Sequence, residues 1–129
     1  MRVYSLWDCY TIADLVTYPS LFEGWGNQFL EAISARLPIA VFEYPVYQED
    51  IKGRGFEVIS FGSGADGTDD LGLVSVSEGT IRQVARQAVG VLTDSSLRQG
   101  MIEHNFHLGQ NHYSLESLGR YLAAIVGRC

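Results

Sequence analysis

Two glutamates stand at positions where a carboxylate is well placed to bind a ligand. Glu23 lies in a glycine-containing loop, and Glu31 follows within the pattern of the next helix. Glu31 lies about one helical turn beyond Asn27, roughly 6 Å along the axis at about 1.5 Å per residue. Both carboxylates are therefore expected to face the opening of the same pocket.

The loop between the two glutamates has the composition of a phosphate-binding loop. Gly24 and Gly26 flank Trp25, and glycine allows backbone dihedrals closed to other residues and a close approach of a ligand to the main chain. A loop that leads into a helix start points free N–H groups and the positive end of the helix dipole at one spot. That spot suits a phosphate.

Each glutamate also has a plainer interpretation, which the sequence leaves open. Apolar neighbours cover most of the helix around Glu31, so its carboxylate either has a partner or lies on the one solvated stripe of a core helix. The segment Ser20-Leu-Phe-Glu23 has the form of a capping box, which would make Glu23 a helix cap.

The surrounding sequence predicts the elements that hold this loop. Leu15–Tyr18 has the content of a buried strand, and Phe29–Arg36 that of a helix that stops before Pro38. With Ile39–Phe42 as the next strand, a right-handed crossover between parallel strands follows, and pockets in such sheets open at the carboxyl ends of the strands. Further elements are expected at Leu6–Ala13 (helix), Phe56–Ile59 and Leu71–Val76 (strands), and residues 77–92, 97–108 and 115–126 (helices, the first capped by Ser77 and the last by Ser114).

Other polar and aromatic residues add little chemistry. Tyr44 and Tyr47 follow the second strand and either line the pocket or pack in the core. The three histidines of residues 104–112 have no carboxylate or cysteine nearby to complete a metal set, so solvent-facing or capping roles are expected. The aspartates of residues 66–70 lack the alternating ligand positions of a calcium loop and favour a mobile surface loop. No metal site is expected.

Composition excludes several classes of function. The chain has 129 residues and a formal charge of −6, which argues against a nucleic-acid partner and offers no basic face for anionic membranes. No apolar run approaches the roughly 20 residues of a membrane span, and no secretory leader is evident. Cys9 and Cys129 have no metal-ligand spacing and are expected to be reduced thiols. We expect a soluble, cytoplasmic protein.

The loop and its flanks resemble a known signature. Tyr-Pro-Ser-x-x-Glu-Gly-Trp-Gly-Asn-x-x-x-Glu-Ala, which begins at Tyr18, is similar to the motif of the retaining glycosyltransferases of family 4. In that motif two glutamates are separated by seven residues, as Glu23 and Glu31 are. The resemblance extends to residues 6–14, 37–41 and 44–51, and it is more specific in the first half of the chain than in the second.

The resemblance implies a fold and a set of roles. The fold is a three-layer, Rossmann-like α/β domain with a mainly parallel sheet and a helical tail, the carboxyl-terminal half of a GT-B fold. The first glutamate, Glu23, would lie against the donor sugar as the catalytic residue. The loop amides of Gly24, Trp25, Gly26 and Asn27 would hold the sugar and diphosphate, and Glu31 would hold the nucleotide ribose. Trp25 stands where the family usually has Phe, a change that could narrow the sugar pocket.

The implied ligand is a nucleotide-diphosphate sugar such as a UDP-, GDP- or ADP-sugar, which is a substrate, so no cofactor is expected. Family members also have an amino-terminal acceptor domain, and basic residues that hold the phosphates precede the part represented here. We therefore interpret residues 1–129 as a single partial domain, truncated at its amino terminus and inactive alone. Two other hypotheses stay open: a non-catalytic module that self-associates through uncovered apolar surface, and a nucleotide-sugar epimerase of the same fold.

Overall fold

A parallel three-stranded sheet forms the centre of the molecule. The computed structural model describes residues 4–127. Strands β1 (Val16–Tyr18), β2 (Ile39–Val41) and β3 (Ile59–Ser60) lie in the order β1-β2-β3, with Val16 opposite Ile39 and Ala40 opposite Ile59. Every strand runs in the same direction, so the segments that follow the strands meet at one edge of the sheet.

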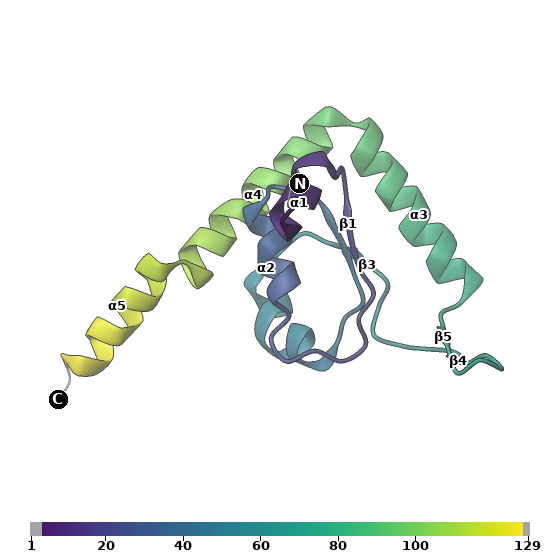
Figure 1. The fold of residues 1–129 in the computed structure, drawn as a ribbon, viewed down its shortest axis with the longest axis horizontal. Helices are drawn as coiled ribbons and strands as arrows, with labels where there is room; N and C mark the ends of the chain where they lie inside the picture. The colour runs from purple at the N-terminus through teal and green to yellow at the C-terminus, as the bar shows by residue number, and fades with distance from the viewer. Residues whose placement is uncertain (1–3, 128–129) are drawn as a thin grey trace.

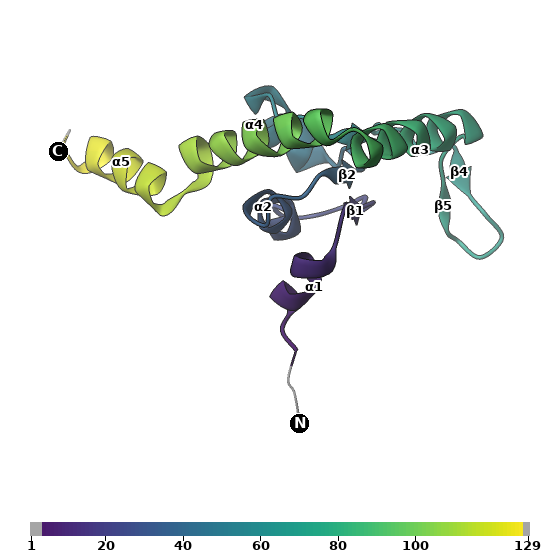
Figure 2. The ribbon, with the colours of Figure 1, turned by 90° about the horizontal axis from the view of Figure 1, so that it is seen from above.

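Successive side chains along each strand point to opposite faces of the sheet, so the hydrophobic core has one part on each face. Ile39 and Val41 point to one face, where they pack with α2 (Asn27–Ser34). Ala40 points to the other face, toward α3 (Glu78–Thr93) and the first part of α4 (Ser95–Tyr113). In Figure 2, α3 and α4 run above β1 and β2, and α2 lies beside the strands, beneath α4. The predicted three-layer α/β arrangement is confirmed.

Helix α4 continues past the sheet and packs its second half against α2. A Cβ added at Gly109 in α4 would lie 2.9 Å from the Cγ2 atom of Ile33 in α2, so the small residue permits this close approach. Helix α5 (Leu115–Val126) then extends away from the body of the molecule (Figure 1).

Side-chain caps mark the starts of the last three helices. The Ser77 hydroxyl accepts a hydrogen bond from the Thr80 N–H at the start of α3. Asp94 caps α4 and Ser114 caps α5 in the same way. Such caps satisfy N–H groups that have no partner inside the helix, and both predicted serine caps are confirmed.

The structure departs from the sequence-based expectation in three places. The third strand begins at Ile59 rather than Phe56, because the side chain of Asn105 binds both backbone polar groups of Glu57, at 2.8 and 2.7 Å. Part of the expected surface loop forms a two-stranded antiparallel hairpin, in which β4 (Gly67–Thr68) pairs with β5 (Val74–Ser75). A π-helical turn, η1 (Tyr47–Ile51), and a 3₁₀ turn, η2 (Lys52–Arg54), link β2 to β3. Helix α1 (Leu6–Ile12) lies close to its predicted position.

His104 and Asp69, two of the residues for which the sequence favoured roles other than metal binding, have local structural partners. A ring nitrogen of His104 lies 2.9 Å from the carbonyl oxygen of Gly55, and one carboxylate oxygen of Asp69 accepts the N–H groups of Leu71 and Leu73 in the turn of the hairpin. Within residues 4–127 no group of His, Cys, Asp and Glu could hold a metal ion, and no helix is long and apolar enough to cross a membrane. Cys9 is exposed and unpaired, and Cys129 lies outside the described residues.

Candidate functional site

The glycine loop lies at the carboxyl end of β1 and leads directly into α2. Gly26 precedes the helix with φ +84°, in the left-handed region that favours glycine. No side chain caps α2 among the described residues, whereas α3, α4 and α5 each have a side-chain cap. The amino terminus of α2 therefore keeps N–H groups available for an outside acceptor, such as a phosphate oxygen.

Close packing holds the loop in this conformation. The hydroxyl of Tyr44 donates to the carbonyl of Trp25 at 3.2 Å. A Cβ added at Gly26 would lie 2.2 Å from that hydroxyl oxygen and 2.9 Å from the adjoining ring carbon. The loop thus needs glycine at this position for two reasons, its dihedral angles and the phenol beside it. Tyr44 and Tyr47 are fully buried, so of the two roles left open by the sequence, packing is the one they have.

Glu23 is held by a hydroxyl from its own loop. The Ser20 hydroxyl donates to one carboxylate oxygen of Glu23 at 2.6 Å. This hydrogen bond, followed by one from the Tyr18 phenol, holds the pKa of Glu23 below its usual range, so the carboxylate is ionised at neutral pH. No helix begins at Ser20, and the capping-box interpretation is therefore wrong.

Glu31 is half-buried and has a partner from a distant part of the chain. The hydroxyl of Tyr10 in α1 donates to Oε2 of Glu31 at 2.8 Å. Burial, and then the hydrogen bond and charge of Glu31, raise the pKa of Tyr10 to about 12. The phenol is therefore a neutral donor at neutral pH, and Glu31 is not a solvated residue on an open stripe.

Tyr18 brings the two glutamates into one neighbourhood. Its hydroxyl lies 3.2 Å from the side-chain oxygen of Gln28. Burial, followed by hydrogen bonding to Glu23 and the charges of Glu23 and Glu31, raises the pKa of Tyr18 well above its ordinary value. Both carboxylates therefore act on the same phenol, at the end of β1.

Trp25 and Asn27 take different positions around the junction. The half-buried indole of Trp25 packs edge-on against Tyr113 near the end of α4, with 4.8 Å between ring centroids, and Tyr113 in turn stacks on Phe56. The side chain of Trp25 thus joins the loop to α4 by packing. Asn27, the first residue of α2, is exposed.

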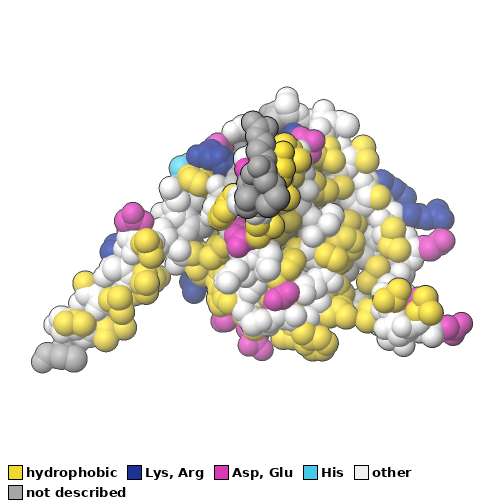
Figure 3. All heavy atoms as spheres, in the orientation of Figure 1, with side chains coloured by type: hydrophobic (Ala, Val, Ile, Leu, Met, Phe, Trp, Pro, Cys, Tyr) yellow, Lys and Arg dark blue, Asp and Glu magenta, His cyan; other side chains and the backbone are white. Residues whose placement is uncertain are grey.

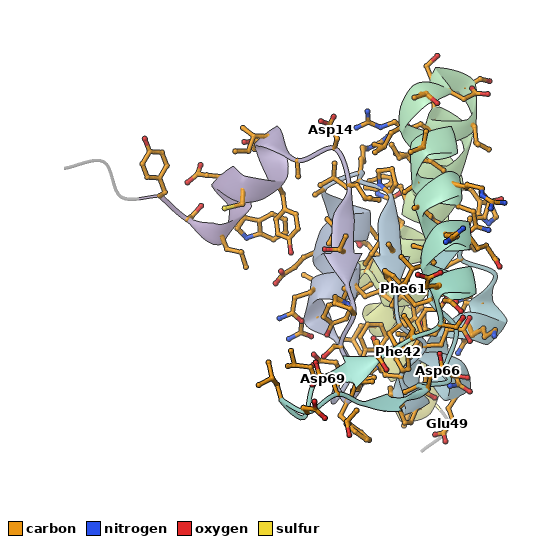
Figure 4. The ribbon with its side chains drawn as sticks, turned by 90° about the vertical axis from the view of Figure 1, so that its right-hand side faces the viewer. Asp14, Phe42, Glu49, Phe61, Asp66 and Asp69 are labelled. Carbon is orange, nitrogen blue, oxygen red and sulfur yellow. The ribbon has the colours of Figure 1, made fainter. Side chains whose placement is uncertain are left out.

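An apolar groove adjoins the loop at the same edge of the sheet. It has a volume of about 490 Å³, and its walls include Pro19, Phe42, Phe61 and Leu73. Figure 4 shows Phe42 and Phe61 near the carboxyl ends of the strands and Asp14 at the opposite end. Glu43, the residue after Phe42, accepts hydrogen bonds from Lys52 and Ser60, both at 2.7 Å. The groove therefore has apolar walls, and the carboxylate that follows Phe42 in the chain is fixed by two hydrogen bonds.

The sequence analysis missed the phenols that surround the carboxylates. The sequence places Tyr10 in the expected helix of residues 6–13 and Tyr18 at the end of a strand, but it names no partner for either hydroxyl. A signal was available, because a buried tyrosine hydroxyl usually has a hydrogen-bond partner, which phenylalanine would not need. Glu31, in an otherwise apolar helix, was the natural candidate for that partner.

The geometry defines a Rossmann-like α/β domain whose glycine loop and uncapped helix are suited to an anionic ligand that also carries hydroxyl groups. Over 120 residues, 93% of its length, the chain is 45% identical to the mannosylglucosylglycerate synthase of Thermotoga maritima, a glycosyltransferase. It is 42% identical over 115 residues to the enzyme of the same name from Petrotoga mobilis. The chain spans about a quarter of these relatives, 28% and 26% of their lengths. No protein-family model and no solved structure matches the chain. The chain is thus similar in sequence to one segment of these two glycosyltransferases.

Proposed function

We propose that this chain forms the donor-binding part of a retaining glycosyltransferase with the GT-B fold. The observation that carries the proposal is the uncapped start of α2, which follows a glycine loop, with the half-buried carboxylates of Glu23 in the loop and Glu31 in the helix. A nucleotide-diphosphate sugar has matching chemistry: a diphosphate for the N–H groups and two sets of hydroxyls for the carboxylates. The similarity to glycosyltransferases supports the same assignment.

In this proposal each group has one task. The amides of Gly24 to Asn27 donate hydrogen bonds to the diphosphate, and Glu31 accepts hydrogen bonds from the ribose hydroxyls. Glu23 binds hydroxyls of the donor sugar near its anomeric carbon. It is ionised at neutral pH, so its negative charge favours the positive charge that develops on the sugar.

The proposed reaction exchanges one bond at the anomeric carbon for another. The bond to the diphosphate oxygen breaks, and its electron pair leaves with the diphosphate, whose growing charge the loop amides stabilise. The acceptor oxygen bonds to the same carbon on the same face, and its proton passes to the departing phosphate oxygen. An alternative mechanism in which Glu23 is a nucleophile stays open.

The name of the relatives suggests the substrates of the whole protein. Their product contains mannose, glucose and glycerate. We propose that the whole protein transfers a mannosyl unit to a glucosylglycerate acceptor, with the acceptor bound mainly outside the present chain.

Amide-shift titration by NMR tests the donor site. The chain is titrated with UDP-, GDP- and ADP-sugars, and shifts are expected for Gly24, Gly26, the Trp25 indole and α2 with one of the three nucleotides. The Glu31→Gln variant should bind more weakly with the fold intact. If none of the three produces shifts in the chain or in the longer protein that contains it, the donor-site proposal is wrong.

Turnover of the longer protein tests the role of Glu23. Glu23→Gln is nearly isosteric but removes the charge, so we expect a loss of at least about 100-fold in kcat with an unchanged thermal midpoint. A variant that transfers sugar at the full rate would exclude a catalytic role for Glu23.

The apolar surface of α5 favours a second candidate function, self-association. Leu115, Leu118 and Leu122 are 83%, 51% and 52% exposed, and hydrophobic side chains line the visible side of this helix (Figure 3). Sedimentation velocity over a range of concentrations tests the idea: association that Leu118→Glu abolishes would support it, and a constant monomer would exclude it.

A further inference from the structure

Helix α1 contacts the site through one tyrosine. It has no buried residue, and Leu6 and Ile12 are 60% and 85% exposed. Among the hydrogen bonds of the described residues, the one that links α1 to another element joins the Tyr10 hydroxyl to Oε2 of Glu31, at 2.8 Å. The ring of Trp7 packs on the ring of Tyr10, with centroids 5.4 Å apart. Tyr10 thus has a ring contact within its own helix and a hydrogen bond to a carboxylate of another helix.

A carboxylate on a long side chain has a poorly defined orientation unless something fixes it. The last torsion of glutamate is broad, so its two oxygens exchange places readily on an unpaired side chain. The bond from Tyr10 engages Oε2 and leaves Oε1 available as an acceptor. Ionised carboxylates accept several hydrogen bonds at once, so a ligand hydroxyl can bind beside the phenol.

We propose that Tyr10 is a positioning residue that orients the Glu31 carboxylate toward the ribose hydroxyls of the nucleotide, an inference that rests on the proposed donor site. The phenol makes Glu31 selective for ribonucleotides, because a fixed acceptor favours a ligand that carries the 2′-hydroxyl over one that lacks it. The phenol stays protonated at neutral pH, since the pKa of Tyr10 is raised to about 12. It therefore remains a donor under all conditions of the assay.

The test compares ribonucleotides with deoxyribonucleotides. Dissociation constants of the 129-residue chain are measured by NMR for UDP, GDP and ADP and for their 2′-deoxy forms. For the nucleotide that binds, Tyr10→Phe should weaken binding of the ribonucleotide about 3- to 10-fold, the effect of one hydrogen bond, and leave the 2′-deoxy form within about twofold. The matched control is Tyr4→Phe, which removes a hydroxyl from a residue that is 73% exposed and should change neither constant.

The outcomes separate this inference from the proposed function. If neither the wild-type chain nor the longer protein that contains it binds any of the nucleotides, the donor site and the role of Tyr10 are both rejected. If it binds a ribonucleotide preferentially and Tyr10→Phe keeps that preference, only the role of Tyr10 is overturned. Equal binding of both forms by the wild type would reject the ribose contact of Glu31 and, with it, the role of Tyr10.

A second measurement needs no ligand and detects the hydrogen bond itself. Titration of the Tyr10 ring carbons by NMR should show a phenol pKa of about 12 in the wild type and a lower pKa in Glu31→Gln, because burial still raises it but the carboxylate charge is gone. Identical titration of the two proteins would overturn the contact on which the inference depends.

Discussion

Gly26→Ala tests whether the glycine loop is held by its own dihedrals and by Tyr44. Gly26 has φ +84°, and an L-residue in this left-handed region costs about 1 to 2 kcal/mol. The new Cβ would also lie 2.2 Å from the Tyr44 hydroxyl oxygen, a contact that cannot exist without movement of that ring.

The ring of Tyr44 has little room to move. Tyr44 is fully buried and makes an edge contact with Tyr18 at 5.9 Å between centroids. Forcing extra atoms into a packed core costs about 1 to 3 kcal/mol, and displacement of the ring also breaks its bond to the Trp25 carbonyl. We therefore expect Gly26→Ala to lower the free energy of unfolding by about 2 to 5 kcal/mol.

Urea denaturation followed by circular dichroism measures this loss. Gly24→Ala is the matched control in the same loop, because nothing lies within 4 Å of its added Cβ, and it should change stability by less than about 0.5 kcal/mol. In the Tyr44→Phe background the nearest clashing atom is absent, so Gly26→Ala should cost less than in the wild type. Equal midpoints for Gly26→Ala and Gly24→Ala would refute the reasoning.

Two further predictions concern single hydrogen bonds. Ser20→Ala removes the hydroxyl that stabilises the charged form of Glu23, so the pKa of this carboxylate should rise toward the ordinary 4.5, as measured by its side-chain carbon shift. Because the pKa of Glu23 is lower in the folded protein than in the unfolded chain, the ionised carboxylate stabilises the fold at pH values above 4.5, and this stability is lost as the pH falls through the folded pKa. Ser20→Ala should therefore lose less stability on acidification than the wild type. An unchanged titration of Glu23 would contradict this prediction. Asn105→Ala leaves the N–H and carbonyl of Glu57 without their side-chain partner and should cost about 2 to 4 kcal/mol in urea denaturation. Asn111→Ala, at an exposed position of the same helix, is the control, and a similar small effect of both changes would show that the buried pair contributes little.

Local sequence alone determined most of the elements. The serines before α3 and α5 predict the starts of these helices, because a short hydroxyl side chain satisfies the first free N–H groups wherever it precedes a helical pattern. The crossover from β1 through α2 to β2 follows from apolar runs separated by a helix, and the glycine loop lies at the expected edge of the sheet. These features depend on neighbours within a few residues, which any window of sequence contains.

Tertiary structure decided how the site is held together. Tyr10 and Glu31 are 21 positions apart, and nothing local shows that the phenol reaches the carboxylate. Asn105 is 48 positions from Glu57, whose backbone it binds in place of a strand partner, so the third strand starts later than its apolar run. The sequence shows only that Gly26 lies in a glycine-containing loop, whereas in the structure the ring of Tyr44 beside it leaves no room for a side chain. The types of the site residues can be read from the sequence, but their partners come from segments that meet only after folding, because contacts across a sheet or between helices have no fixed spacing along the chain.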